Sequence, residues 1–191
     1  MGGYRLRLIL YSEVEVIREI EIPDNITFER LNFIIQKLFG FRNSHMWEFR
    51  IPKHNSEEID LNVVENTISM KQSLRKKVNQ VFDKYDIIDY IYDFGDNWEI
   101  LIFKLEKTPY KNKTALIHDY KGRYNPMEDM GGIFVFEEIM EAVNAGEDIV
   151  DVASEYGIEK YEISIMMDFE NKYEKGSRIR LNDREWVLRL D

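Results

Sequence analysis

The stretch "DIIDYIYDFGDNWEILIFKLE", residues 86–106, holds two apolar segments joined by a short polar turn. In the first segment every second residue is large and apolar: Ile88, Tyr90, Tyr92 and Phe94. The second segment is almost continuously apolar, which is typical of a strand covered on both faces. Between them, Gly95 and Asp96 fit a two-residue type II′ turn, whose first central position requires a positive φ. We therefore expect a central antiparallel hairpin with Gly95 at a positive φ.

Upstream of this hairpin the sequence predicts two strands, a helix and a third strand. Apolar side chains alternate over residues 4–10 and again over 14–20. Pro23 then stops the pairing, and three nearby residues are available as a helix cap: Asp24, Asn25 and Thr27. An apolar stripe at helical spacing ends at Gly40 and consists of Phe28, Leu31, Ile34, Ile35 and Leu38. With residues 45–51 as the third strand, we expect an α+β fold that opens strand-strand-helix-strand, with helices packed on a mainly antiparallel sheet.

The rest of the chain is less regular. Residues 52–62 and 107–132 read as loops, whereas the apolar positions of "FEEIMEAV" predict a helix that closes near Gly146. A short helix is expected over residues 148–156, and Asn182-Asp183 suits the turn of a hairpin. The simplest organisation is one domain over residues 1–145, with residues 146–191 as a C-terminal extension packed on it.

Composition narrows the class of protein. The chain has 191 residues, no cysteine, and a formal net charge of -10. The lack of cysteine excludes disulfides, thiolate zinc sites and cysteine nucleophiles. No apolar run approaches the roughly eighteen residues of a membrane span, and the start lacks the apolar region of a signal peptide. We expect a cytoplasmic protein that does not associate with a membrane.

Charge also bears on the partner. An acidic protein repels polyanions over long range, so we expect a protein or small-molecule partner in preference to DNA, and no strong DNA binding at physiological salt. One stretch, "KQSLRKK" at residues 71–77, is locally basic, and apolar residues keep helical spacing through it: Leu74, Val78 and Val81. We interpret it as the solvated face of an amphipathic helix in preference to a phosphate-binding patch.

Five blocks carry a resemblance to a known family. In order they are "VIREIEIPDNITFERLNFIIQKLFGF", "HMWEF", "YDFGDNWE", "RYNPMEDMGG" and "FEEIMEAV". With this order and spacing the chain resembles the plasmid pRiA4b ORF-3-like family from Tyr4 to about Val143. The resemblance implies association with transposon-borne resolvase genes. Recombinase activity is not expected, because the sequence has no nucleophile amid the clustered arginines that neutralise a scissile phosphate.

The motif residues that match the family are mainly acidic. They are Asp93, Asp96, Glu128 and Asp129, with His45 and Arg123 beside them. The family usually has a histidine where this chain has Ile100, and a cysteine where it has Met130, so neither group carries over as a ligand or base. We expect the "YDFGDNWE" and "RYNPMEDMGG" motifs to meet in space, although about thirty residues separate them.

Two interpretations of this acidic site stay open. In the first, the carboxylates only cap backbone N–H groups at a turn and a helix start, or pair with Arg123. In the second, they bind an oxygen-preferring cation such as Mg²⁺, Mn²⁺ or Ca²⁺. The corresponding functions are a small binding or interaction module, accessory to a mobile-element process, or a divalent-metal-dependent hydrolase acting on phosphate esters or nucleic acid.

Overall fold

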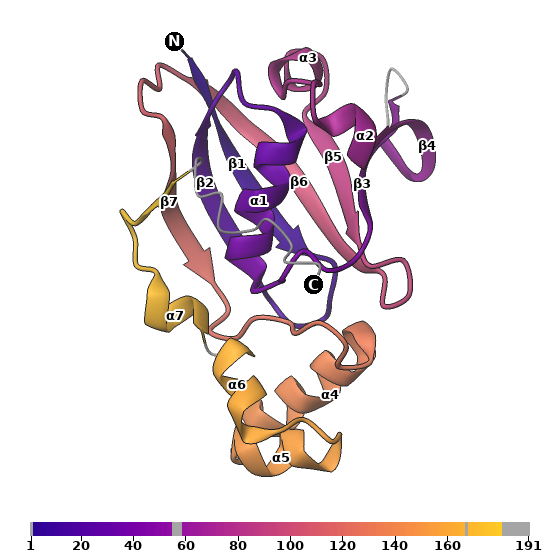
Figure 1. Cartoon of the computed structure of the whole chain (residues 1–191), viewed down its shortest axis with the longest axis vertical. Helices are drawn as coiled ribbons and strands as arrows, with labels where there is room; N and C mark the ends of the chain where they lie inside the picture. The colour runs from indigo at the N-terminus through magenta and orange to yellow at the C-terminus, as the bar shows by residue number, and fades with distance from the viewer. Residues whose placement is uncertain (1, 55–58, 167, 181–191) are drawn as a thin grey trace, which may run out of the picture.

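The fold is α+β and is built around one sheet. The computed structural model describes residues 2–54, 59–166 and 168–180. The strands are β1 (Gly3–Leu10), β2 (Ile17–Pro23), β3 (Trp47–His54), β4 (Ile59–Ser69), β5 (Ile87–Tyr92), β6 (Trp98–Thr108), β7 (Thr114–Lys121) and β8 (Arg178–Arg180). Their spatial order is β4-β3-β5-β6-β1-β2-β7-β8, and the neighbouring strands pair antiparallel (Figure 1).

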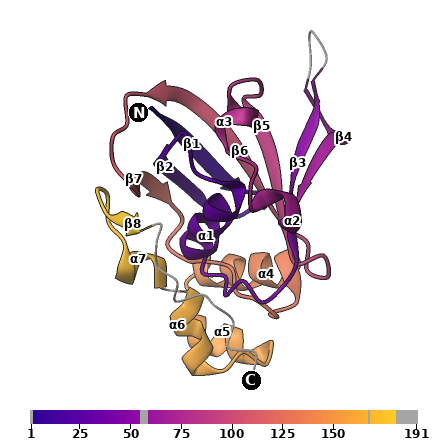
Figure 2. The same cartoon turned by 45° about the horizontal axis from the view of Figure 1, so that its top comes forward.

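The helices lie on one face of the sheet and at one of its ends. They are α1 (Phe28–Phe39), α2 (Met70–Ser73), α3 (Asn79–Phe82), α4 (Gly132–Asn144), α5 (Ile149–Glu155), α6 (Lys160–Met166) and α7 (Asp168–Lys172). Helix α1 crosses one face of the sheet, and α4, α5 and α6 gather beyond one end of it (Figures 1 and 2). None of the described helices is long and apolar enough to span a membrane.

Local signals fix α1 as the sequence predicts. Thr27 is the N-cap, and its hydroxyl oxygen accepts from the Arg30 N–H at 3.3 Å. Gly40 ends the helix in the left-handed conformation, at a φ of 76°. The apolar stripe is buried, while Gln36 on the same face donates to the Tyr90 hydroxyl of β5 at 2.8 Å. This bond ties the helix to the centre of the sheet.

The central hairpin is confirmed, but its predicted turn is wrong. Strands β5 and β6 pair from Ile87 to Tyr92, with Tyr92 opposite Trp98. Five residues, 93–97, connect them in place of the two of a type II′ turn. The positive φ angles fall on Asp93 (55°) and Asn97 (53°), not on Gly95. Asp93 thus adopts the positive φ that was expected of Gly95. Its carboxylate also stabilises the turn, because it accepts from the Gly95 N–H at 3.0 Å.

Two segments interpreted as loops contain strands. Strand β3 continues to His54 and β4 starts at Ile59, within the expected loop 52–62, and β7 lies within 107–132. The physical reason is composition. Strand β4 lies at the edge of the sheet, and residues 63–66 of it are exposed, so it lacks an apolar alternation.

The predicted basic helix is broken in two. Helix α2 ends at Ser73 and α3 starts at Asn79, and Leu74 is 54% exposed where the helical interpretation expected an apolar face. At the other end of the chain, α4 and α5 follow the predicted ranges, and their buried residues Phe136, Ile139 and Val152 share one core cluster with the sheet. The predicted hairpin turn at Asn182-Asp183 lies outside the described residues.

Candidate functional site

Three loops meet at the end of the β5–β6 hairpin. They are residues 41–46 between α1 and β3, residues 93–97 between β5 and β6, and residues 123–131 before α4, and we call this region the loop junction. Among the described residues, all four non-glycine positions with a positive φ lie in it: Asn43, Asp93, Asn97 and Asp129. Asparagine and aspartate are the residues that tolerate this conformation best. The backbone of each loop is therefore held in one specific path.

Glu128 is the buried centre of the junction. Its side chain has no exposed surface, and its carboxylate accepts from four donors. Two belong to Arg42, whose backbone N–H lies at 2.6 Å and whose Nε lies at 3.0 Å. The others are the Ser44 hydroxyl, at 2.7 Å, and the Tyr92 hydroxyl, which makes a very short bond. Glu128 thereby ties the loop before α4 to the other two segments.

Hydrogen bonding, not burial, decides the charge of Glu128. Burial alone would raise the pKa of this carboxyl, but the bonds from Tyr92, Ser44 and Arg42 outweigh burial and lower the pKa below its ordinary value. Burial raises the pKa of the Tyr92 hydroxyl, and the bond to Glu128 raises it further, so the tyrosine keeps its proton. Glu128 is an ionised structural group.

The second contact between the motifs is a close backbone approach. Gly132, the first residue of α4, has a φ of 78°, and a β-carbon there would lie 3.2 Å from the backbone oxygen of Asp96. The Gly132 N–H also hydrogen-bonds to Asp96, which lowers the carboxyl pKa slightly against the larger effect of burial. These contacts confirm that the two motifs meet. The Asp96 carboxyl therefore lies at the start of α4.

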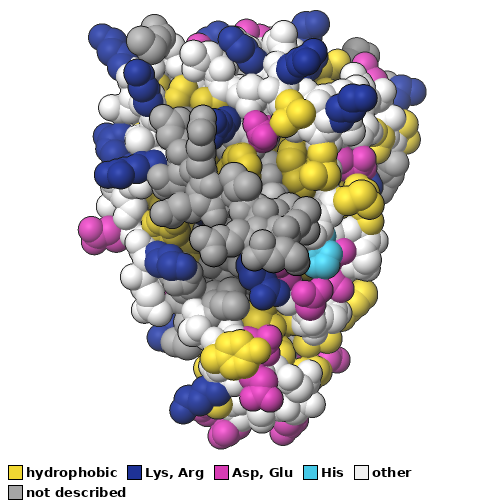
Figure 3. All heavy atoms as spheres, in the orientation of Figure 1, with side chains coloured by type: hydrophobic (Ala, Val, Ile, Leu, Met, Phe, Trp, Pro, Cys, Tyr) yellow, Lys and Arg dark blue, Asp and Glu magenta, His cyan; other side chains and the backbone are white. Residues whose placement is uncertain are grey.

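A second group of side chains lies at the outer side of the junction. His45 Nδ1 is 3.5 Å from Asp93 Oδ2, and His45 Nε2 is 3.2 Å from Asp129 Oδ1. One ligand atom from each of these three residues lies within 4.8 Å of the other two, which is the spacing of a metal site. Figure 3 shows a histidine side chain at the surface against a group of acidic side chains. This group is accessible, since the Asp129 side chain is 64% exposed.

Asp96 adds negative potential beside this group. Its Oδ2 atom is buried and has no hydrogen-bond partner among the residues that the structure describes. Burial raises the pKa of the Asp96 carboxyl, and the nearby charges of Asp93 and Asp129 raise it further. The carboxylates of Asp93, Asp96 and Asp129 thus repel one another.

The predicted site residues are brought together with one exception. Arg123 forms an ion pair with Glu170 at 3.2 Å and stacks over Tyr124, so it does not serve the carboxylates as expected. Arg42 takes that role, and it also lies 3.5 Å from Asp129. Sequence reasoning did not identify Arg42, Ser44 or Tyr92. A signal existed for Tyr92, because a tyrosine on the buried face of a strand needs a partner for its hydroxyl.

Comparisons with known proteins agree on the family and give no activity. The family model described as "Plasmid pRiA4b ORF-3-like protein" matches residues 3–171. An uncharacterized protein, y4hQ, from Sinorhizobium fredii is 32% identical over 143 residues, which cover 73% of this chain and 72% of that protein. The crystal structure of MM3350, a protein of unknown function from Methanosarcina mazei Go1, matches with a TM-score of 0.65 and 24% identity, covering 82% of this chain and 90% of that one. The last match shows a shared fold.

Proposed function

The chain belongs to the plasmid pRiA4b ORF-3-like family, and we propose that it is a small binding module that holds one divalent cation between His45, Asp93 and Asp129. One observation carries this proposal: the three ligand atoms, one from each loop of the junction, lie within 4.8 Å of one another. The positive φ angles of Asp93 and Asp129 support it, because strained backbone often marks a functional site.

The local charge balance favours a cation. The junction gathers four carboxylates, from Asp93, Asp96, Glu128 and Asp129, and the Arg42 guanidinium contacts two of them, Glu128 and Asp129. Arg42 makes its hydrogen bonds with Glu128, through its backbone N–H and its Nε. A bound divalent cation relieves the repulsion among the remaining three carboxylates and offers a charge to the buried Asp96 Oδ2.

The donor set points to manganese as the best-matched ion. Carboxylate oxygens suit Mg²⁺, Ca²⁺ and Mn²⁺, whereas an imidazole nitrogen suits first-row transition metals, and Mn²⁺ accepts both. A hydrolase with two metal ions would use more carboxylates than the junction offers, because Glu128 is already bound by four donors. Three available ligands suit one ion and a binding role. The accessory role in a mobile-element process rests on the family resemblance alone and stays a separate proposal.

Thermal unfolding tests the cation site. Protein stripped with EDTA should gain about 5–10 °C in Tm with Mn²⁺ at a hundredfold excess over Kd, because a ligand that binds only the native state stabilises it by about 2.7 kcal/mol at that excess. Mg²⁺ should give a smaller shift. The loss of the free Mn²⁺ signal in electron paramagnetic resonance measures the same binding directly.

Matched variants make the test specific. Asp129→Asn should remove most of the Mn²⁺ shift, whereas Asp151→Asn, an equally exposed change in α5, should keep it. Equal shifts in the two variants, or no Mn²⁺ binding by the native protein at millimolar concentration, would show that the junction is only a structural network.

A further inference from the structure

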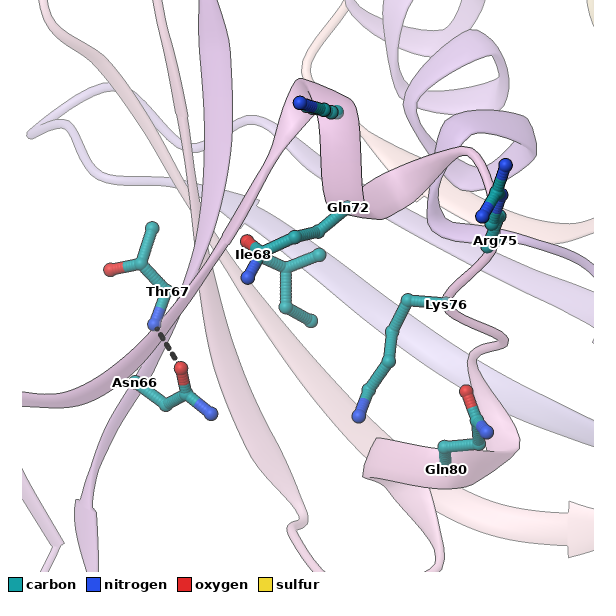
Figure 4. A pocket seen from close by; sticks show the side chains of 8 residues that line it. Asn66, Thr67, Ile68, Gln72, Arg75, Lys76 and Gln80 are labelled. Atoms are coloured by element: carbon teal, nitrogen blue, oxygen red, sulfur yellow. Dashed lines mark hydrogen bonds between the residues drawn. The ribbon is translucent and has the colours of Figure 1, made fainter.

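A cavity of ≈390 Å³ lies between the edge strand β4 and the segment that carries α2 and α3. Seven polar side chains line it: Asn66, Thr67, Lys71, Gln72, Arg75, Lys76 and Gln80. Figure 4 shows Lys76 and Gln72 extending into the space between the strand and the helices. The buried side chain of Ile68 is an apolar part of its wall.

The break in the predicted basic helix creates this cavity. The Lys76 carbonyl accepts from the Phe28 N–H at 2.9 Å, and the Val78 N–H donates to the Ile26 carbonyl at 2.9 Å. These two bonds hold the segment between α2 and α3 beside the start of α1, where Thr27 and Lys77 form an isolated bridge. A continuous helix would have spread the cations along a solvated face. The bent chain gathers them around one hollow.

The three carboxamides present only donors to the cavity. The Asn66 side-chain oxygen accepts from the Thr67 N–H at 2.8 Å, that of Gln72 from the Ser69 N–H at 2.9 Å, and that of Gln80 from the Lys77 N–H at 2.9 Å. Since each partner is an N–H group, the oxygen must face it, and this fixes the orientation of each amide. Within the described residues, none of the three NH₂ groups makes a hydrogen bond.

The three cations have no counter-ion in the part of the chain that the structure describes. Lys71, Arg75 and Lys76 form no ion pair or side-chain hydrogen bond there, and no acidic residue lines the cavity. Two exposed cations elsewhere do pair with carboxylates, Lys107 with Asp83 and Lys121 with Glu15. A wall with three unpaired cations, three carboxamides that present N–H donors and no carboxylate is complementary to an anion with several acceptor oxygens.

We propose that this cavity binds the phosphate group of a small phosphorylated molecule. A phosphate monoester offers three acceptor oxygens and close to two negative charges, which match the lysine and arginine cations and the amide donors. The volume lies at the lower end of the range for small-molecule sites. The net charge of -10 disfavours a polymer of phosphates, whose neighbouring charges would lie over acidic surface. This site is separate from the proposed cation site and does not depend on it.

Titration calorimetry with glycerol phosphate tests the assignment, with glycerol as the uncharged counterpart and inorganic phosphate as the minimal probe. At a pH of about 8 the phosphate is dianionic, because its second pKa is about 6. The pocket variant carries Lys71→Gln, Arg75→Gln and Lys76→Gln. The control variant carries Lys84→Gln, Lys111→Gln and Lys160→Gln, which are exposed positions elsewhere, so both variants lose the same charge. Urea unfolding of both variants checks that the fold is kept.

Glycerol phosphate and inorganic phosphate should bind the native protein and the control variant alike, while glycerol should not bind. The pocket variant should lose about tenfold in affinity for each cation removed, because a hydrogen bond to a charged group contributes about that factor. Equal affinity in the two variants, or equal affinity for glycerol and its phosphate, overturns the proposal. A single-stranded oligonucleotide that binds far more tightly than glycerol phosphate, and loses this in the pocket variant, shows that the ligand is a polymer and overturns the small-molecule assignment.

Discussion

Two regions of the molecule each bury a carboxylate and treat it in opposite ways. At the loop junction, Glu128 is 2% exposed and accepts from four donors. On the sheet face opposite α1, Asp89 of β5 is 8% exposed, and its Oδ1 atom is buried with no hydrogen-bond partner in the described part of the chain. The pKa of Glu128 is lowered, whereas burial and the neighbouring charge of Glu99 raise the pKa of Asp89 to about 7.

The difference shows that the number of hydrogen-bond donors around a buried carboxyl, and not the extent of its burial, decides whether its pKa is lowered or raised. Burial pushes both pKa values upward. Glu128 overcomes it because the loop of residues 41–46 and the end of β5 supply N–H and O–H groups. Asp89 lies within a strand whose backbone groups are already paired, and Arg50 of the neighbouring strand only partly offsets burial. The junction carboxylate therefore stays ionised and joins segments of the fold, whereas the pKa of the sheet carboxyl lies close to neutral pH.

Removing the junction carboxylate should give the largest effect. Glu128→Ala leaves the Tyr92 and Ser44 hydroxyls and the Arg42 backbone N–H without their acceptor, and we expect a loss of about 3–5 kcal/mol in the free energy of unfolding. Urea unfolding at pH 7 measures it. Asp129→Asn, at the exposed neighbour, removes the charge but keeps a residue that tolerates the positive φ, and it should cost less than about 1 kcal/mol. Similar costs for the two variants would remove the structural role of Glu128.

Replacing the sheet carboxylate should have the opposite sign. Because the folded-state pKa of Asp89 is raised, its favourable contribution is complete below a pH of about 4 and is lost as the pH rises through about 7. Asp89→Asn keeps the shape and removes the titration, so at pH 8 the variant should be more stable than the native protein by about 1–4 kcal/mol. At pH 4 the two should be nearly equal. Urea unfolding across this pH range compares them, and a constant difference would show that Asp89 does not titrate there.

The smallest effect should come from the backbone contact that docks α4 on the turn. Gly132 and Gly157 have nearly equal φ angles, 78° and 76°, but only at Gly132 would a β-carbon meet other atoms within 4 Å. Both alanine variants suffer the same backbone strain, so their difference isolates the contact with Asp96. We expect Gly132→Ala to cost about 1 kcal/mol more than Gly157→Ala in thermal unfolding. Equal costs would show that charge alone, without this close packing, joins the two motifs.

Much of the scaffold could be predicted because its signals are local. The alternation in β1 and β2, the Thr27 and Gly40 caps of α1, and the apolar strands of the β5–β6 hairpin each depend on residues close in sequence. The acidic residues of the junction could also be predicted, since two rigid, punctuated motifs with complementary groups pointed to one meeting place. Strands β4 and β7 could not, because their polar sequences pair only when a neighbouring strand is present.

The sequence by itself determined which side chains carry charge and which segments prefer to be helix or strand. Only the tertiary structure decided which charged side chains form ion pairs and which have no partner among the described residues. Arg42, and not Arg123, reaches Glu128, because the end of α1 brings residue 42 beside the loop before α4. The cations of residues 71–77 line a cavity because the backbone near Phe28 bonds to Lys76 and bends the chain there. Both outcomes depend on contacts between segments far apart in sequence, and the free energy of a charge is set by the groups that such contacts place around it.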